Sequence, residues 1–391
     1  MNVSLIVFLK EVRENLRDKR TLINALFTGP LIGPLMFVML MNTLISRQLN
    51  LAEAPLVLPV IGASNAPNLI EALHQQGLDP QPPVADPIEA VRSRDAALVL
   101  RIPAGFGDSW KKGDPAQVEI YYDSSRRDSQ PPVNRLRNML ENYSRRTGAL
   151  RLVARGLSPA LSGPVVVDER DQSTPQSRAG ALFSILPYFF VFTVFIGGMY
   201  LSIDLTAGER ERQSLEPLFV NPVPRWRILL GKIGAICLFS VTSLLICVTA
   251  FTLAGRLIPT ERLNMDLGLG PAFALKVLVL MLPLVLLIAA LQTLVAAFSK
   301  GYREAQTYLG ILMLVPVLPS VLLSVMPVKT VAWMYAVPLL GQQVGITELL
   351  IGGSVTGAQV ALCLLCGFAV AALTLAITAR VYGSERLAIS A

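Results

Sequence analysis

Six long apolar stretches restrict this chain to folds that cross a lipid bilayer. They lie at about residues 21–45, 181–203, 228–257, 273–298, 307–325 and 358–378. Each is close to the length of about 20 residues that an α-helix needs to cross a hydrocarbon core of roughly 30 Å. Hydrophobic residues also make up 53% of the chain and charged residues only 16%, which is typical of membrane proteins. The sequence therefore predicts a mainly α-helical membrane protein with six transmembrane helices per protomer.

A further apolar stretch, residues 330–351, differs from the other six. It is interrupted by Pro338 and Gly341, is followed by Gly352, and carries one acid, Glu348. Non-helical backbone at membrane depth has to be covered by protein. We therefore expect a broken or re-entrant pair of half-helices before the last span, and not a seventh crossing.

Basic residues are distributed unequally between the two sides of the predicted spans. With the N-terminus inside, the short inner segments hold 13 Lys and Arg residues, whereas the short outer segments hold only Arg262 and Lys329. Such an excess marks the cytoplasmic side of a membrane protein. We expect a multi-pass protein of a bacterial-type inner (cytoplasmic) membrane, with both termini and the loop 204–227 in the cytoplasm.

The first 20 residues predict an amphipathic helix that lies along the cytoplasmic membrane surface. Leu5, Leu9, Val12 and Leu16 recur at helical spacing, while charged side chains fill the other faces. This elbow helix would lead into the first span, residues 21–45. That span is better explained by an uncleaved signal anchor than by a signal peptide, because its apolar run is too long.

Residues 46–179 predict a large extracytoplasmic α/β domain between the first and second spans. Short β-rich runs indicate strands near residues 56–63, 96–102, 118–122 and 165–168. Helical patterns occupy residues 68–76, 106–112 and 132–156. This alternation is typical of a small domain with its own core. The only histidine, His74, lies at a polar helix end, where we expect it to be a solvated surface residue.

The loop 204–227 separates the second and third spans within the transmembrane domain, residues 180–391. Ser214 can cap a short helix that Asn221 and Pro222 would end. The apolar side chains of this helix, which would be poorly solvated alone, are Leu215, Leu218 and Phe219. Two interpretations are open: an apolar face that presses into another protein, or an amphipathic connector between two membrane helices.

Cys363-x-x-Cys366 matches a redox or metal-binding pattern only in its spacing, and in an apolar helix it is better explained by two small buried residues. Walker A, HExxH and Gly-x-Ser-x-Gly motifs are absent, as is any His, Cys and acid cluster of metal-ligand spacing. We therefore expect no enzymatic activity, cofactor or metal site in this chain. Its spans also lack a carboxylate near mid-bilayer, which disfavours an ion-driven carrier. The net charge of +7 belongs mostly to the membrane part, so it indicates topology and not nucleic-acid binding.

Uncharged polar residues inside the spans allow two interpretations. Most could hydrogen-bond between packed helices, but some could line a pathway. The candidates for a pathway are Gln292, Thr293, Gln306, Thr307 and Glu348. A buried amide is costly to leave unpaired, which favours the two glutamines. The carboxylate at position 348 would either be exposed to solvent at the outer interface or contact a cation at the outer mouth.

Four segments resemble the permease subunits of type-2 ABC exporters, especially the sodium-extrusion (NatB-like) branch. They are KEVRENLRDKRT (Lys10–Thr21), IPAGFGDSWKKGDPAQVEIYYDSS (Ile102–Ser125), GERERQSLEPLFVNPVPRWRILLGK (Gly208–Lys232) and YGSERL (Tyr382–Leu387). The third is similar to the family's coupling element, in which charged residues precede a Ser-Leu-Glu run, a proline and a basic residue. The resemblance covers nearly the whole chain.

This resemblance implies partners that the chain itself does not contain. Two copies of a separate ABC ATPase would bind ATP and magnesium, and a second permease, identical or paralogous, would complete the pathway. The coupling residues would be Glu209, Arg210, Glu211, Arg212, Ser214, Leu215, Glu216, Leu218 and Phe219. Their charged members would set the docking register on the ATPase, and their apolar members would form the buried anchor.

Three functions compete at this point. The first is the permease subunit of an ATP-driven exporter of sodium or of a drug, lipid or peptide. The second is a membrane-anchored extracytoplasmic binding or sensing protein without transport activity, although one anchoring helix would then suffice. The third is an integral-membrane enzyme, which the lack of a convergent catalytic set disfavours. We expect the first.

Overall fold

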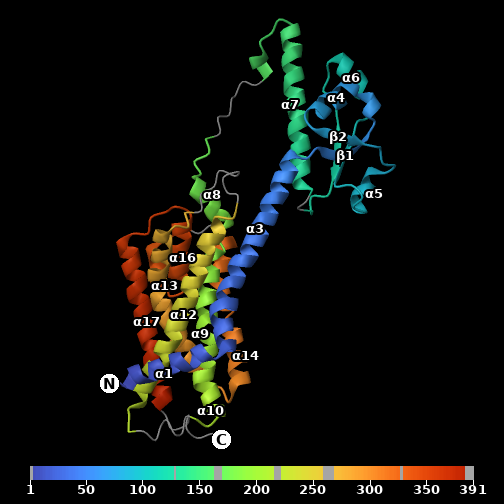
Figure 1. Cartoon of the computed structure of the whole chain (residues 1–391). Helices are drawn as coiled ribbons and strands as arrows, with labels where there is room; N and C mark the ends of the chain where they lie inside the picture. The colour runs from blue at the N-terminus through green and yellow to red at the C-terminus, as the bar shows by residue number, and fades with distance from the viewer. Residues whose placement is uncertain are drawn as a thin grey trace. The chain divides into compact units, whose positions relative to one another are not determined.

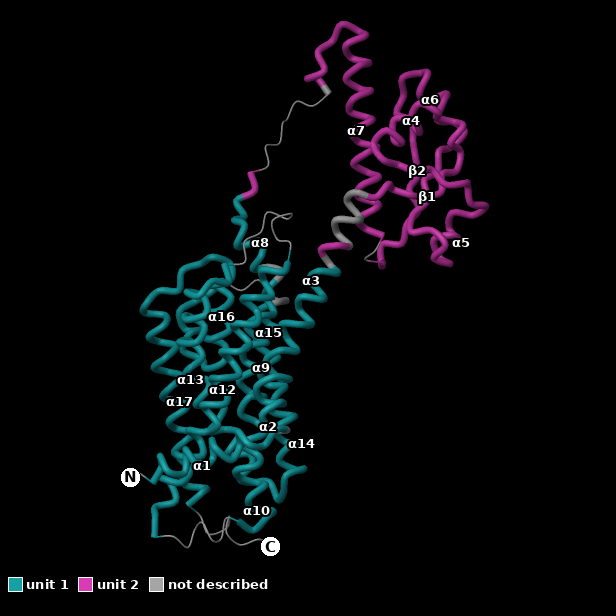
Figure 2. The backbone as a smooth tube through the Cα atoms, in the orientation of Figure 1, with its two compact units in different colours: residues 1–44, 172–391 teal, residues 45–171 magenta. Residues whose placement is uncertain are grey.

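A computed structural model describes six segments of the chain. They are residues 3–126, 129–162, 170–214, 222–258, 268–325 and 329–383. The chain divides into two compact units (Figure 2). The membrane unit comprises residues 1–44 and 172–391, and the α/β unit comprises residues 45–171. Each unit has its own architecture.

The membrane unit is helical throughout its described length, as Figure 1 shows. Its elements in chain order are α1 (Val3–Arg17), α2 (Lys19–Ile23), η1 (Asn24–Thr28), α3 (Gly29–Glu53, which continues into the second unit), α8 (Pro175–Leu182), α9 (Leu186–Ile203), η4 (Asp204–Gly208), α10 (Glu209–Glu211), α12 (Arg225–Gly255), α13 (Pro271–Phe298), α14 (Tyr302–Leu312), α15 (Val317–Val325), η6 (Ala332–Ala336), α16 (Leu340–Leu350) and α17 (Gly357–Gly383). Both η1 and η4 are π-helical turns that join neighbouring α-helices.

Within the described residues, six helical segments are long and apolar enough to cross a membrane, which agrees with the predicted number of spans. They are Asn24–Thr43, Leu186–Glu211, Arg225–Gly255, Pro271–Phe298, Tyr302–Leu323 and Gly357–Gly383. The second differs most from its prediction, because the helix continues past the end of the apolar run at Ile203. The prediction ends this span where the apolar residues end, whereas the backbone stays helical through η4 and α10.

Helix α9 forms the centre of the membrane unit. It packs against both α12 and α13, and 72% of the residues in the most apolar part of its span are buried within the chain. Gly197 allows α12 to come close, since a Cβ atom there would lie 2.6 Å from the Ser243 hydroxyl. By contrast, only 11% of the residues in the corresponding part of Tyr302–Leu323 and 17% of those in Gly357–Gly383 are buried. Those two spans therefore leave apolar surface for lipid or another subunit.

The stretch 330–351 forms two short helical pieces, η6 and α16. Leu339, between them, has a positive φ of 77°, a conformation that is costly for a residue with a side chain. The Gln342 side chain stabilises this turn by accepting a 2.6 Å hydrogen bond from the Leu339 backbone N–H. Neither piece is long enough to cross a membrane.

The α/β unit is built on a four-stranded sheet of order β2-β1-β3-β4. Its elements are β1 (Leu56–Ile61), η2 (Ala63–Asn65), α4 (Pro67–Gln75), β2 (Leu78–Gln81), α5 (Pro87–Arg92), β3 (Leu98–Arg101), α6 (Phe106–Lys112), β4 (Glu119–Tyr122), α7 (Gln130–Ala154) and η3 (Pro159–Ser162). Strand β1 is parallel to β2 and β3, with Leu56 opposite Leu78 and Val60 opposite Leu100, whereas β4 is antiparallel to β3. The strand expected at residues 165–168 lies outside the described residues.

Helices cover both faces of this sheet. Leu98 and Leu100 of β3 belong to the core that β3 shares with α4, α6 and α7. Val99, on the opposite face, belongs to a smaller core with Ala90 and Val91 of α5. Because successive side chains of a strand point to opposite faces, this alternation requires cover on both sides. Both β2 and α5 are absent from the sequence-based prediction, since each is short and contains a proline.

Candidate functional site

The predicted coupling loop, residues 204–227, starts as a continuation of the second span. Glu209, Arg210 and Glu211 form α10, and Arg212 and Ser214 follow it. The Ser214 hydroxyl donates to the Glu209 carbonyl at 3.1 Å, so it closes the end of this helix. The other predicted coupling residues, Leu215, Glu216, Leu218 and Phe219, lie outside the described residues, as does the short helix expected to contain them.

A buried ion pair joins this loop to the third span. Lys232 of α12 is 1% exposed, and its ammonium group donates to the Glu209 carboxylate and, at 2.8 Å, to the Leu205 carbonyl. A charge buried without a partner would cost several kcal/mol, so each group requires the other. Two consecutive spans are therefore held together at the point where the coupling loop leaves the bundle.

The elbow helix α1 adds a buried carboxylate to the same place. Glu11 is 1% exposed and pairs with Lys10 at 3.3 Å, and Asn15, one turn on, donates to the Glu11 carbonyl at 2.9 Å. Burial raises the pKa of the Glu11 carboxyl, and the charge of nearby Lys232 opposes this rise. The ring of Tyr382, at the end of α17, lies with its centroid 5.9 Å from the Lys232 ammonium nitrogen. We call Glu11, Glu209, Lys232 and Tyr382 the charged junction.

Two glycines of α12 allow the elbow helix to approach. A Cβ atom at Gly231 would lie 2.7 Å from the Ser4 carbonyl oxygen and 2.8 Å from the Val7 Cβ. One turn on, a Cβ atom at Gly234 would lie 3.2 Å from the Phe8 ring. Contacts below 3.0 Å are sterically forbidden, so only glycine fits at position 231 without moving α1. The close packing of α1 on α12 brings Glu11 to the junction.

The structure corrects the sequence-based interpretation of the elbow helix at one charged residue. Leu5, Leu9 and Leu16, which were expected to form its membrane-facing side, are about half exposed in the chain, at 48%, 50% and 53%. They remain available to lipid. Glu11 is one of the charged residues that the sequence pattern places on the other faces of this helix, but it is buried against the bundle. A sequence signal did exist: Lys232 is a charge inside an apolar stretch and requires a buried partner.

The start of the coupling loop also contacts the turn between the fourth and fifth spans. The Arg210 guanidinium donates to the Ser299 carbonyl at 3.3 Å, and the Glu211 carboxylate accepts from the Tyr302 backbone N–H at 2.8 Å. Arg212 pairs back to Asp204 at 2.7 Å. A displacement of α10 would therefore reach α13 and α14 as well as α9 and α12.

Comparisons with known proteins identify the family. The profile of the ABC-2 family transporter proteins matches residues 25–379. The chain belongs to the ABC-2 transporter family. It is 26% identical over 321 residues to the ABC transporter permease protein NatB of Bacillus subtilis (strain 168), an alignment that covers 80% of each chain. No solved structure matches the chain. This ABC-2 protein is thus a membrane permease of an ABC transporter, and its family implies an ABC ATPase as partner.

The predicted pathway residues of this ABC-2 permease do not converge on one place. Gln292 and Thr293 are buried in α13. The Gln292 side-chain N–H donates to the Phe195 carbonyl of α9 at 2.7 Å, and the Thr293 hydroxyl donates within its own helix to Ala289. The buried Gln292 side-chain oxygen has no hydrogen-bond partner among the described residues. It is therefore the strongest of the predicted pathway groups.

The other three predicted pathway residues lie elsewhere in the permease. Gln306 and Thr307 are exposed on α14, where the Thr307 hydroxyl donates to the Arg303 carbonyl of its own helix. Glu348 of α16 is half-buried and accepts a hydrogen bond from the Thr330 hydroxyl. This contact joins the two ends of the broken stretch. The structure therefore separates these five residues into an interior pair, an exposed pair and a single carboxylate.

Two buried amides of α16 were not among the predicted pathway residues. Gln342 and Gln343 are both 0% exposed. Gln343 accepts from the Ser320 hydroxyl at 2.9 Å and donates to the Pro316 carbonyl at 3.1 Å, so it holds α16 to the fifth span. The Gln342 side-chain nitrogen has no partner in the part of the chain that the structure describes. The sequence did contain a signal for these buried amides, because two adjacent glutamines stand in an otherwise apolar stretch.

Proposed function

We propose that this ABC-2 permease couples ATP hydrolysis by a separate ATPase to the export of a substrate across the membrane. The charged junction carries this proposal. Burying a lysine between two buried carboxylates costs free energy of desolvation, so this arrangement adds little net stability to the fold. Its position, at the contact of the elbow helix, the coupling loop and the third and last spans, suits transmission of movement.

In this mechanism the ATPase binds the coupling loop and displaces α10 when its nucleotide-binding domains close. Glu209 lies on α10, so α10 cannot move without pulling Lys232 of α12. Arg210 and Glu211 transmit the same displacement to the turn before α14. Leu215, Leu218 and Phe219 would be the apolar anchor in the ATPase, with Glu216 and the charged residues of α10 setting the register.

We further propose that two permeases, identical or paralogous, pair with two ATPase subunits. The exposed apolar surface of the fifth and sixth spans supports pairing, because a pathway at a subunit interface needs such surface on each partner. Leu314, Leu318, Leu365 and Leu373 are each more than 60% exposed in the single chain. The substrate would be sodium or a drug-like or lipid-like molecule.

Reconstitution with the copurified ATPase tests this function. Compounds that are substrates should stimulate ATP hydrolysis in proteoliposomes, and ATP should drive their movement across the membrane. Leu218→Asp should abolish both responses while the permease remains inserted, since a carboxylate cannot occupy an apolar groove without a large desolvation cost. Undiminished ATP-driven transport by Leu218→Asp would contradict the proposed coupling.

A further inference from the structure

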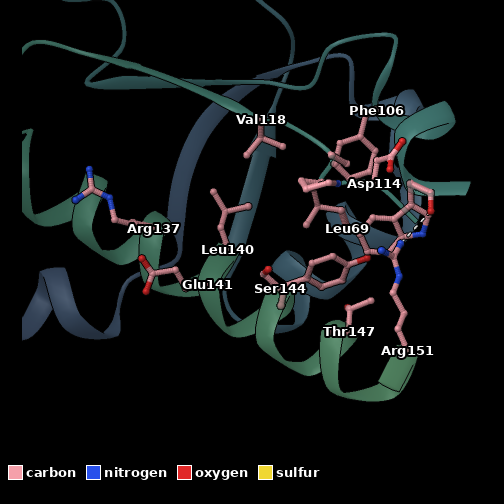
Figure 3. A pocket seen from close by; sticks show the side chains of 15 residues that line it. Leu69, Phe106, Asp114, Val118, Arg137, Leu140, Glu141, Ser144, Thr147 and Arg151 are labelled. Atoms are coloured by element: carbon pink, nitrogen blue, oxygen red, sulfur yellow. Dashed lines mark hydrogen bonds between the residues drawn. The ribbon is translucent and has the colours of Figure 1, made fainter. Parts of the chain in front are cut away.

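An elongated pocket of about 380 Å³ lies in the α/β unit, between α7 and the segment that contains α6 and the loop after it (Figure 3). Its centre is apolar, with Leu69, Val118 and Leu140 on its walls. Its size falls in the range of sites for small organic ligands, and its walls come from several elements that share one hydrophobic core. Neither the spans nor the coupling loop contributes to it.

One wall of the pocket is a stack of three aromatic rings. The Trp110 ring lies 5.6 Å from that of Phe106 and 5.8 Å from that of Tyr143, with interplanar angles of 16° and 22°. The Arg151 guanidinium lies 4.2 Å from the Trp110 ring centroid and donates to the Trp110 carbonyl at 3.0 Å. These contacts hold one cationic group in place at the pocket wall before any ligand arrives.

Each end of the pocket carries one guanidinium and one carboxylate. Figure 3 shows Arg137 with Glu141 at one end, and Arg151 with Asp114 at the other. Neither couple is joined by an ion pair in the described part of the chain. Both ends therefore offer hydrogen-bond donors and acceptors together, which a simple anion or a simple cation would use only in part.

We propose that this pocket binds a short, apolar peptide in an extended conformation. Peptide groups and free peptide ends present both donors and acceptors, which matches the composition of each end. Apolar side chains match the aliphatic walls, against which the hydroxyls of a sugar would lose their hydrogen bonds to water. Glu141 and Arg151 are ten residues apart on α7, or about 15 Å. An extended peptide of about four residues spans that distance.

Tryptophan fluorescence of the full-length permease tests the proposal. The chain has three tryptophans, and Trp226 and Trp333 are about half exposed, so both can be replaced by Phe to leave Trp110 as the sole reporter. A pool of tetrapeptides composed of Leu, Ile, Val and Phe should change this fluorescence saturably at concentrations below about 1 mM. A pool composed of Ser, Thr, Asn and Gln should not, and neither should maltotetraose. No response to the apolar pool, or an equal response to the sugar, would overturn the proposal.

Two variants of the same tryptophan background place the binding in this pocket. Nothing lies within 4 Å of a Cβ atom built at Gly148, so Gly148→Phe fits the helix and fills the pocket. It should abolish the response. Arg151→Leu should weaken the affinity about tenfold through loss of a charge-assisted hydrogen bond. Arg146→Leu, exposed on the same helix and outside the pocket, should leave the affinity unchanged. Undiminished binding by both pocket variants would overturn the proposal, and neither result bears on ATP-driven export, which needs the ATPase.

Discussion

At the residue scale, the charged junction is the feature of this permease that an apolar core would not need. Lys232 and Glu209 are buried together in the bundle, and Glu11 is the other buried charged side chain among its described residues. A buried ion pair adds little net stability, yet removing one partner leaves an uncompensated charge. The pair therefore responds very differently to single and to double substitution.

Lys232→Met should destabilise the permease by about 3–5 kcal/mol, because Glu209 is then buried without its cation. The double variant Glu209→Gln, Lys232→Met should recover most of that loss. Lys276→Met, an exposed lysine of α13, is the matched control and should change stability by less than about 0.5 kcal/mol. Thermal unfolding in detergent measures all three. A double variant no more stable than Lys232→Met would show that the two charges do not compensate each other.

The raised pKa of Glu11 predicts how the stability of the permease depends on pH. Burial raises its pKa above the ordinary value of 4.5, so the folded protein binds this proton more tightly than the unfolded chain does. This tighter proton binding stabilises the folded permease fully below pH 4.5, and the stabilisation is lost as the pH rises through the raised pKa of Glu11. Glu11→Gln should therefore be stabilising relative to the parent at neutral pH, and the difference should shrink on acidification. A difference that grows towards low pH would contradict the burial of an ionised Glu11.

At the element scale, packing of the elbow helix on the third span is what assembles the junction. Gly231→Leu should push α1 away from α12 and lower stability by about 1–3 kcal/mol, since the new side chain would meet the Ser4 carbonyl and Val7. Gly310→Ala is the control, because nothing lies within 4 Å of a Cβ atom there and alanine favours a helix. If Gly231→Leu matched this control in thermal unfolding and in ATP-driven transport, the close approach of α1 would be unimportant.

Hydropathy was sufficient to predict the membrane-spanning helices of this permease, but neither their contacts nor short elements such as α5. All six spans could be predicted because about 20 apolar residues have few alternatives to a transmembrane helix. The burial of Glu11 could not, because the face that α1 presents to α12 depends on glycines of another helix. The burial of Gln292 and the exposure of Gln306 likewise depend on the fold, and the place of Gln292 in a pathway stays a prediction. The part of the coupling helix from Leu215 to Phe219 stays a prediction.

At the scale of the whole molecule, the account requires the coupling loop and the α/β unit to face opposite sides of the membrane. In a variant without its four native cysteines, Gln117→Cys should react with an impermeant maleimide added to intact cells. Gln213→Cys should react only after the membrane is opened. Both positions are exposed in the structure, so access and not burial decides the outcome. Labelling of Gln213→Cys in intact cells would reverse the assigned orientation.

The proposed function requires an ABC ATPase to act on this permease through the coupling loop. The most direct test is the amount of Walker A-containing ATPase that copurifies with the full-length permease, measured by quantitative mass spectrometry. We predict that Leu218→Asp lowers this amount about tenfold or more, as expected for loss of a buried apolar anchor. Leu150→Asp, a control at a 64% exposed leucine of the α/β unit, should leave it unchanged. Equal recovery of the ATPase with Leu218→Asp and with the parent would contradict the claim.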